Sequence, residues 1–373
     1  MSHFCLLKDP QAYVAHKYDL LADEVARAYW LDHFANHFTQ TLSHAAKQYG
    51  RTAAKQIAAA EQEFADVIES LRARPESIEG GRLNVMSLCR LREKALRGNR
   101  LKDPFAHIKE RENVSAMDLY PQVVRNLHAR SGVDKWLHLV ESVFAGNVFD
   151  LGSSATMHLA LEPTDFLATV DNTRPRPWFI DDFDLLVDDL PDSPPAIWSR
   201  AVVFVDNAGS DFILGVMPFV RELALSGTQI VLAANELPSL NDITADEAED
   251  VLGLLAGMDD DLAALVDAGM FEIVSTGNDL PLIDLSDVSD ELNEAAANAD
   301  LIILEGMGRS VESNLDAEFT VDTLWLATIK DEKVADHVGC ELFDCVCQYC
   351  PIDHDDEDEE GEEGDEDQPA SEL

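Results

Sequence analysis

The sequence predicts an α/β protein in which a helical N-terminal bundle precedes a doubly wound, mostly parallel sheet with a Rossmann-like three-layer core. Two observations predict this fold class. Residues from about 10 to 130 carry apolar side chains at helical spacing. From about residue 135 onward, short apolar runs alternate with helical patterns, which is typical of a parallel sheet covered by helices.

We expect three parts: a helical N-terminal subdomain over residues 1–132, an α/β core over 133–352 and an acidic tail over 353–373. The chain has 373 residues, which is long enough for two folding units. The tail holds 13 Asp or Glu residues and no Lys or Arg. Because such a segment has too little apolar surface to bury, we expect it to be disordered.

The helical region divides into four predicted helices, over residues 19–50, 52–74, 83–96 and 116–131. The first of them repeats apolar side chains at helical spacing, as in Leu31, Phe34 and Phe38. Gly50 is expected to cap its C-terminus. Pro75 ends the second helix because proline cannot continue a helix from within.

The α/β region contains six clear strand patterns, over residues 201–205, 229–233, 271–274, 301–304, 324–329 and 342–348. Helical patterns over 212–226 and 245–268 lie between the first three. The run 201–205 is apolar throughout, which indicates a strand that is buried on both faces.

The chain is strongly acidic, with 27 basic and 72 acidic residues and a net charge of −45. A surface of this charge repels phosphate backbones and anionic lipids, so we expect no nucleic-acid and no membrane partner. No apolar run approaches the roughly 20 residues that span a bilayer. The N-terminus also lacks the layout of a signal peptide. We therefore expect a cytoplasmic protein.

Four of the six cysteines gather at positions 340, 345, 347 and 350. A zinc site is one interpretation of this cluster, but the spacing lacks two separated C-x-x-C pairs. The segment 341–349 alternates as a strand does, which would place Cys345 and Cys347 on one face. We prefer a role in the core, because free cysteine packs as a small apolar side chain.

Polar side chains follow each central strand of the predicted sheet. They are Asp206 and Asn207 after the first strand, Asn235 to Asp242 after the second, Ser275 to Gly277 after the third, Glu305 to Arg309 after the fourth, and Lys330 after the fifth. The carboxyl ends of parallel strands meet at one edge of a sheet, where open α/β sheets bind ligands. We therefore predict a site at this edge.

A divalent metal ion suits the acidic part of this edge. Asp206, Asn207 and Asp242 offer oxygen ligands, which favour Mg²⁺, Mn²⁺ or a similar hard ion over zinc. Such an ion would polarise a phosphoryl oxygen and acidify a water molecule. Position 208 is alanine, so the Asp-x-Asp pair of a phospho-aspartate mechanism is absent. Asp211 is a candidate base or a ligand in the outer shell of the ion.

The phosphate side of the site is predicted to consist of Gly306, Gly308, Arg309 and Lys330, whose N–H groups and positive charges suit phosphate oxygens. Val311 stands where a dinucleotide fingerprint has its third glycine, which argues against a Rossmann-type nucleotide cofactor. Two simpler interpretations stay open. Lys330 could be a lysine at the edge of the core that reaches water, and Asp242 could cap the helix that begins near residue 245.

Several of these segments resemble the metal-dependent damage-control phosphatases, formerly called domain of unknown function 89. The matching blocks are residues 206–211, 235–244, 305–309 and 145–152. Residues 174–178 and the pair Asp103-Pro104 are similar to one subgroup of that family. This subgroup contains the phosphatase domain of some animal pantothenate kinase fusions and stand-alone plant relatives. Only the acidic tail falls outside the resemblance.

The resemblance implies a phosphatase that hydrolyses phosphate monoesters of normal or damaged metabolites with a metal-activated water. For the subgroup, it implies action on 4′-phosphopantetheine and its oxidised, sulfonate-bearing forms in coenzyme A metabolism. The implied cofactor is a divalent metal, Mn²⁺, Co²⁺, Ni²⁺ or Mg²⁺, and the partner is a small phosphorylated metabolite. We expect a monomer or a homodimer.

The resemblance also implies a role for each matching residue. The implied metal ligands are Asp206, Asn207 and Asp242. The implied substrate-binding residues are Asn147, Asp150, Glu305, Gly306, Gly308, Arg309 and Lys330. The implied catalytic group comprises Asp206, Asn207, Asp211, Asp242 and Lys330.

Two other functions stay open at this point. The polyacidic tail suits a non-catalytic, metal-binding regulatory protein, although no implied ligand is replaced. A carboxyl methyltransferase, a function also proposed for the wider family, would need a glycine-rich loop after its first strand to bind S-adenosylmethionine. The segment 206–211 contains a single glycine.

Overall fold

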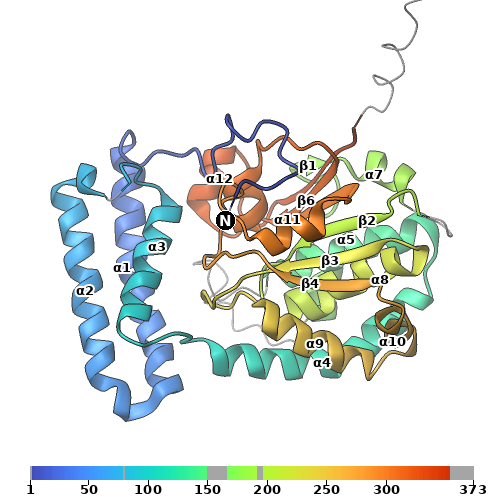
Figure 1. Ribbon diagram of the computed structural model, residues 1–373, viewed down its shortest axis with the longest axis horizontal. Coiled ribbons are helices and arrows are strands. Elements are labelled where there is room, and N and C mark those ends of the chain that lie inside the picture. The colour runs from blue at the N-terminus through green and yellow to red at the C-terminus, as the bar shows by residue number, and fades with distance from the viewer. Residues whose placement is uncertain (1, 79, 149–165, 191–195, 353–373) are drawn as a thin grey trace, which may run out of the picture.

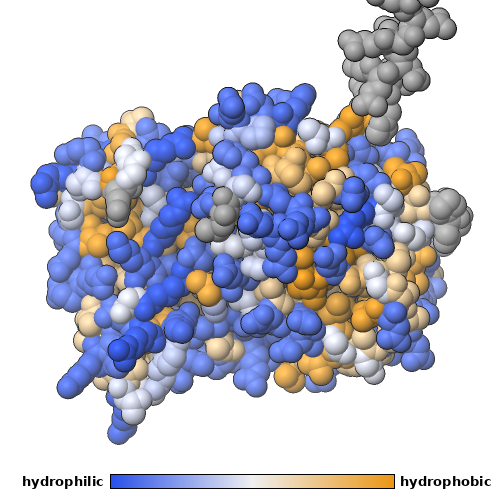
Figure 2. Space-filling model, viewed as in Figure 1, coloured by the Kyte–Doolittle hydropathy of each residue, from blue (hydrophilic) through white to orange (hydrophobic). Residues whose placement is uncertain are grey.

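The computed structural model describes residues 2–78, 80–148, 166–190 and 196–352. Asp150 and the acidic tail lie outside these described residues. Figure 1 shows long helices side by side, next to a larger part in which helices flank a sheet. A helical N-terminal region followed by a mostly parallel sheet is the predicted fold class. Hydrophilic side chains cover most of the face seen in Figure 2, as the composition predicts.

The N-terminal helices are α1 (Glu24–Tyr49), α2 (Ala54–Ala73), α3 (Val85–Gly98) and α4 (Ala106–His128), with 3₁₀ turns at Gly50–Ala53 and Pro75–Ser77. Gly50 caps α1 as predicted: its φ is 66°, and its N–H donates to the carbonyl of Ala46. α4 begins well before its predicted start at residue 116. Its first turns carry mainly polar side chains, so apolar periodicity could not reveal them.

The sheet has the strand order β1-β7-β6-β5-β2-β3-β4. Its strands are β1 (Ile180–Asp181), β2 (Arg200–Phe204), β3 (Gln229–Ala234), β4 (Phe271–Ser275), β5 (Leu301–Glu305), β6 (Asp322–Thr328) and β7 (Cys345–Cys350). All neighbouring strands run parallel except β6 and β7, which are antiparallel. β1 spans two residues, which is too short to leave an alternating pattern in the sequence.

Successive residues of β2 belong to two different cores. Val202 and Phe204 pack in the core that includes α1–α3, whereas Ala201 and Val203 pack in the core that includes α5 and α8. The prediction of a strand buried on both faces is confirmed. The N-terminal segment joins the first core, because the ring of Phe4 packs against that of Phe204 with centroids 5.5 Å apart. The helical region therefore shares its core with one face of the sheet.

The remaining helices are α5 (Gly132–Val148), α6 (Phe166–Asp171), α7 (Phe183–Asp189), α8 (Met217–Ser226), α9 (Ala245–Ala256), α10 (Asp260–Asp267), α11 (Asp290–Ala296) and α12 (Glu332–Val338). The single helix predicted over 245–268 is two helices, because the Asp259 carboxylate accepts from Asp261 and Leu262 N–H groups and starts α10. Two π-helical turns, η4 (Asp211–Val216) and η5 (Met307–Glu312), follow the loops after β2 and β5. Among the described residues, no helix is both long and apolar enough to cross a membrane.

The cysteine-bearing strand β7 begins three residues after its predicted start at 342. The chain turns before it, where Phe343 takes a φ of 63°. Cys345 and Cys347 are buried in one core cluster, as predicted for core residues. Within the described ranges, the cysteines do not gather closely enough to hold a metal ion.

Candidate active site

The carboxyl ends of the central strands bring most of the predicted site residues to one edge of the sheet. Asp206 follows β2, Glu305 ends β5, and Lys330 lies just past β6. Asn207 forms an isolated β-bridge with Asp242, so the loops after β2 and β3 touch each other. All five side chains are buried. The strand pattern of the sequence was therefore enough to find this convergence.

A buried arginine joins the two carboxylates that the sequence predicted as metal ligands. Arg309 Nη1 pairs with Asp206 Oδ1, and Nη2 donates to Asp242 Oδ2 at 2.8 Å. Burial works against the charge of this guanidinium, but Asp242 and Asp206 raise its pKa above the usual value. Nη2 also donates to Asn235 Oδ1 at 3.1 Å. Arg309 thus places a positive charge between two acidic loops.

Three carboxylates surround one amide on the other side of Asp206. Asn147 Nδ2, on α5, donates to Asp206 Oδ2 at 3.3 Å, to Asp211 Oδ2 at 3.1 Å and to Glu305 Oε1 at 3.0 Å. Carboxylate oxygens of the three acids lie within 4.8 Å of one another. Asn207 Nδ2 donates to Asp206 at 3.0 Å and to Asp211 at 2.8 Å. Two amides therefore hold three acids in one buried group.

The close approach of these acids raises their affinity for protons. Burial, reinforced by the charge of Asp206, raises the pKa of Asp211 to about 6, while Lys330 works in the opposite direction. Burial and the charges of Asp211 and Asp206 raise the pKa of Glu305 well above its usual value. Like charges that share a dry site destabilise one another's ionised forms. A divalent cation would relieve this repulsion.

Buried polar atoms without partners lie in the segments that follow β2 and β3. Among the described residues, Ser210 Oγ, Asp211 Oδ1 and both amide atoms of Asn241 are buried with no hydrogen-bond partner. Such atoms are rare in folded proteins unless a water, an ion or a ligand completes them. Their oxygens, together with the neighbouring carboxylates, fit a hard divalent ion. The tightest acid group is Asp206, Asp211 and Glu305, which differs from the predicted trio of Asp206, Asn207 and Asp242.

Two glycines of the predicted phosphate loop allow the backbone to pass very close to its neighbours. Gly306 has a φ of 92°, and a Cβ there would lie 2.3 Å from Asp206 Oδ2. A Cβ on Gly308 would lie 2.3 Å from the carbonyl oxygen of Pro281. The Gly306 N–H donates to Leu326 O at 3.0 Å, so in this structure it is already partnered within the sheet. Its glycine is required for space and for its backbone conformation.

The structure decides against both simpler interpretations. Lys330 is 1% exposed, so it does not reach water from the edge of the core. Its charge instead lowers the pKa values of the nearby Asp211 and Glu305, against the effect of their burial. Thr244 caps α9 and forms a capping box with Glu247. Asp242 is therefore not the cap of that helix, and its carboxylate faces Arg309.

The helical region supplies a wall of the site that the sequence analysis missed. A cavity of about 90 Å³ is lined by Asp206, Asn207 and Asp242 and also by Trp30, His33, Phe34 and His37 of α1 and Arg92 of α3. The α1 residues follow i, i+3, i+4, i+7 spacing, so they share one helix face. The sequence did carry one signal of this wall, since His33 and His37 lie on an otherwise apolar face of α1.

α4 fixes the two acidic loops from the side. Asn113 Oδ1 accepts from the Gly209 N–H at 2.7 Å, three residues after Asp206. The buried Lys109 ammonium pairs with Glu247 Oε1 at 2.6 Å, and Glu247 closes the capping box that follows Asp242. One helix of the N-terminal region thus contacts the segments that carry both acids.

The comparisons with known proteins define the class of protein. Residues 32–346 match the family model of the damage-control phosphatase ARMT1-like domain. The chain therefore belongs to this family, which confirms the resemblance seen in the sequence. It is a phosphatase, as predicted.

Individual relatives narrow the class. A damage-control phosphatase of Arabidopsis thaliana is 44% identical over 290 residues, which cover 77% of this chain and 78% of the relative. Pantothenate kinase 2 of Arabidopsis thaliana is 35% identical, over 93% of this chain and 42% of the relative. The 4′-phosphopantetheine phosphatase of Mus musculus is 30% identical, over 92% of this chain and 48% of the relative. The chain thus spans less than half the length of the last two.

The fold also matches a solved structure. The crystal structure of a DUF89 family protein from Pyrococcus horikoshii superposes with a TM-score of 0.63 at 19% sequence identity. The match covers 86% of this chain and 97% of that one. At this identity the likeness shows a common fold and nothing about substrates.

Proposed function

We propose that this phosphatase hydrolyses phosphate monoesters with a metal-activated water, and that its substrate is 4′-phosphopantetheine or an oxidised or otherwise damaged form of it. The observation that carries the proposal is the buried cluster at the sheet edge. There, acids, amides and Arg309 lie within hydrogen-bonding distance of one another, and Asp211 Oδ1 has no partner among the described residues.

Asp206, Asn207 and Asp242 are the proposed ligands of a divalent ion, Mn²⁺, Co²⁺, Ni²⁺ or Mg²⁺. Asp211 and Glu305 lie close enough to Asp206 to join them. When bound, such an ion would supply Lewis acidity and a water molecule of lowered pKa. Arg309 contacts both Asp206 and Asp242, so its guanidinium would lie beside an ion that these residues held.

The protein's own groups have distinct proposed roles. Arg309 and Lys330 stabilise the negative charge that develops on the phosphate oxygens. Asn147 orients the carboxylates of Asp206, Asp211 and Glu305 through its amide. Asp211 Oδ1 is the proposed proton acceptor for the attacking water, since it carries no hydrogen bond within the described chain.

The substrate class rests on the relatives. The mouse relative is named for 4′-phosphopantetheine, and the plant relative is named as a damage-control phosphatase. A role in coenzyme A metabolism or metabolite repair follows from that proposal. We further propose that the protein acts in the cytoplasm as a monomer or a homodimer.

Phosphate release tests the proposal directly. The chain is assayed with 4′-phosphopantetheine, its sulfonate and p-nitrophenyl phosphate, with each of the four metals and with a chelator. We expect turnover that requires a metal and that falls at least about a hundredfold in Asp206→Asn. Asp250→Asn, at an exposed position of α9, is the matched control. Full activity in Asp206→Asn would overturn the proposed metal site.

The same experiment separates the alternatives. Calorimetric binding of Mn²⁺ without any turnover would favour the non-catalytic regulatory protein. Binding of S-adenosylmethionine, with no phosphate release, would favour the methyltransferase.

A further inference from the structure

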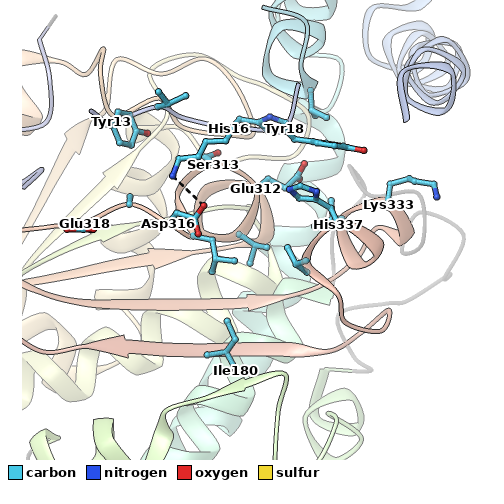
Figure 3. A pocket seen from close by; sticks show the side chains of 18 of the residues that line it. Tyr13, His16, Tyr18, Ile180, Glu312, Ser313, Asp316, Glu318, Lys333 and His337 are labelled. Carbon is cyan, nitrogen blue, oxygen red and sulfur yellow. Dashed lines mark hydrogen bonds and ion pairs between the residues drawn. The ribbon is translucent and has the colours of Figure 1, made fainter. Parts of the chain in front are cut away.

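A second, larger cavity borders the small cavity at the sheet edge. It has a volume of about 610 Å³ and contains none of the proposed metal ligands (Figure 3). Trp30, Val85 and Glu312 line both cavities. We infer that the larger cavity binds the part of the substrate beyond its phosphate, and that it selects a long, uncharged chain that bears amide groups. This inference rests on the proposed phosphatase function and adds the residues that recognise the alcohol.

The sizes of the two cavities support this division. The cavity beside Asp206 and Asp242 measures about 90 Å³, which leaves room for a phosphate-sized group but not for a whole metabolite. Sites for small ligands usually measure about 300–1,000 Å³, and the larger cavity falls in that range. A phosphate ester that reaches Asp206 can extend its alcohol past the shared residues Trp30 and Glu312 into the larger cavity.

The walls of the larger cavity suit a flexible chain. Tyr13, His16 and Tyr18 line one side of it, and Glu312, Ser313, Asp316, Lys333 and His337 lie across from them or at one end (Figure 3). The Tyr18 ring stacks on the His337 imidazole with centroids 4.3 Å apart. Apolar contacts come from residues such as Val14, Phe179 and Val338. Such mixed apolar and polar walls accept methylene and amide segments in turn.

The charge of the lining disfavours a second anionic group. Among the described residues, four carboxylates line the cavity, on Asp9, Glu312, Asp316 and Glu318, against two ammonium groups, on Lys17 and Lys333. Lys17 already pairs with Asp316 at 3.4 Å, and Lys333 pairs with Asp336 at 2.6 Å. A nucleotide tail or a second phosphate would meet net repulsion here. The lining therefore favours an uncharged alcohol and, among the proposed substrates, 4′-phosphopantetheine over its anionic sulfonate.

Two buried polar atoms indicate amides in that alcohol. Trp30 Nε1 and His16 Nδ1 have no hydrogen-bond partner among the described residues, and each side chain is 5% exposed. An indole N–H can donate to an amide carbonyl, and an unprotonated imidazole nitrogen can accept from an amide N–H. Burial lowers the pKa of His16 to about 4, so its imidazole is neutral at pH 7. An amide group offers both kinds of partner, a carbonyl oxygen for the indole N–H and an N–H for the imidazole nitrogen.

Substrate discrimination tests this inference. The readout is the ratio of kcat/KM for 4′-phosphopantetheine to kcat/KM for p-nitrophenyl phosphate, which lacks the chain. We expect Trp30→Phe, which removes one N–H, and His337→Ala, which removes the ring stacked on Tyr18, each to lower this ratio about fivefold. His337 is exposed, so its variant keeps the test valid if Trp30→Phe fails to fold. His128→Ala, at the exposed end of α4, is the matched control.

An unchanged ratio in both variants would overturn the inference. Binding of pantetheine, which has no phosphate, gives an independent measurement on the metal-free chain by calorimetry. We expect wild type to bind pantetheine and His337→Ala to bind it more weakly, whereas no binding to wild type would also overturn the inference. If no phosphate ester is hydrolysed at all, the proposed function fails, and the pantetheine measurement still reports on the cavity.

Discussion

The edge of the sheet and the helical wall that faces it are built from different chemistry. At the edge, charged groups are buried against one another, as Arg309 is against Asp206 and Asp242. The helical side presents mainly aromatic rings and imidazoles, together with the guanidinium of Arg92, and Trp30 Nε1 has no partner there among the described residues. The difference suggests a division of labour, in which strand ends supply charge for phosphate and helices recognise the remainder of the substrate.

The two regions should also differ in how they respond to substitution. A charged group at the sheet edge is held by two or three others, so its loss leaves buried charges without compensation. A residue of the helical wall contributes single hydrogen bonds or ring contacts, whose loss costs less. Four predictions test this comparison.

Arg309→Lys should have the largest effect. A lysine ammonium lacks the planar fork that contacts Asp206 and Asp242 together. We expect activity to fall at least about a hundredfold, and the metal-free protein to lose about 3 kcal/mol of stability. Assays with p-nitrophenyl phosphate and thermal unfolding with and without Mn²⁺ measure the two effects. Equal behaviour of Arg309→Lys and the exposed control Arg111→Lys would contradict the assigned role.

Gly306→Ala should have the second largest effect. The added Cβ would lie 2.3 Å from Asp206 Oδ2, and the φ of 92° is unfavourable for alanine. We expect a loss of at least about 2 kcal/mol in the free energy of unfolding, together with lower activity because Asp206 must move. Gly253→Ala on α9, where the new Cβ meets no atom within 4 Å, should raise stability by up to about 1 kcal/mol. Denaturant titration compares the two variants, and similar losses would refute the steric argument.

His16→Asn tests the N-terminal segment beside the helical wall through the pH dependence of stability. Burial lowers the pKa of His16 to about 4 from an ordinary value of 6.5. The unfolded chain therefore binds more protons between pH 6.5 and 4, and the stability contributed by neutral His16 is lost as pH falls through that window. When the pH falls from 7 to 5, we expect protonation linked to this residue to lower the free energy of unfolding by about 2 kcal/mol.

The asparagine variant should show a pH dependence that is smaller by that amount. Asparagine tolerates the left-handed backbone of this position, where φ is 50°, so strain does not confuse the comparison. Denaturant titrations at pH 7 and pH 5 measure the difference. An identical slope of stability against pH in both proteins would show that His16 is not buried in its neutral form.

Asn113→Ala should have the smallest effect and tests the joint between the two regions. Its Oδ1 accepts from the Gly209 N–H at 2.7 Å, so its loss should cost about 1 kcal/mol and lower kcat several-fold by loosening the Asp206 loop. Asn126→Ala, at an exposed position of the same helix, is the control. If kcat is unchanged in Asn113→Ala, the helical region does not position the acidic loop.

The order of residues along the chain was enough to predict most of the sheet edge. Parallel strands align their carboxyl ends, so Asp206, Glu305 and Lys330 could be placed together from the strand pattern alone. What that pattern could not show was the pairing within the edge. Whether Asp242 caps a helix or faces Arg309 depends on the path of one loop, and Thr244 takes the capping role.

The three predicted metal ligands illustrate the same limit. Asp206, Asn207 and Asp242 were predicted as ligands, yet the tightest group of carboxylates adds Asp211 and Glu305 and leaves Asp242 across Arg309. Side-chain distances of a few ångströms follow from turns such as η4, in which a π-helical turn sets the direction of Asp211. Sequence patterns report periodicity along one segment, and they carry no information at that scale.

The sequence by itself determined the fold class, the family and the sheet edge that carries the acids. These follow from local patterns: apolar period, strand ends and short motifs. Only the tertiary structure decided that Trp30 and His33, far from Asp206 along the chain, line the same cavity. The physical reason is that helix packing against a sheet is set by the whole buried surface, so no single segment encodes which of its polar residues will face the site.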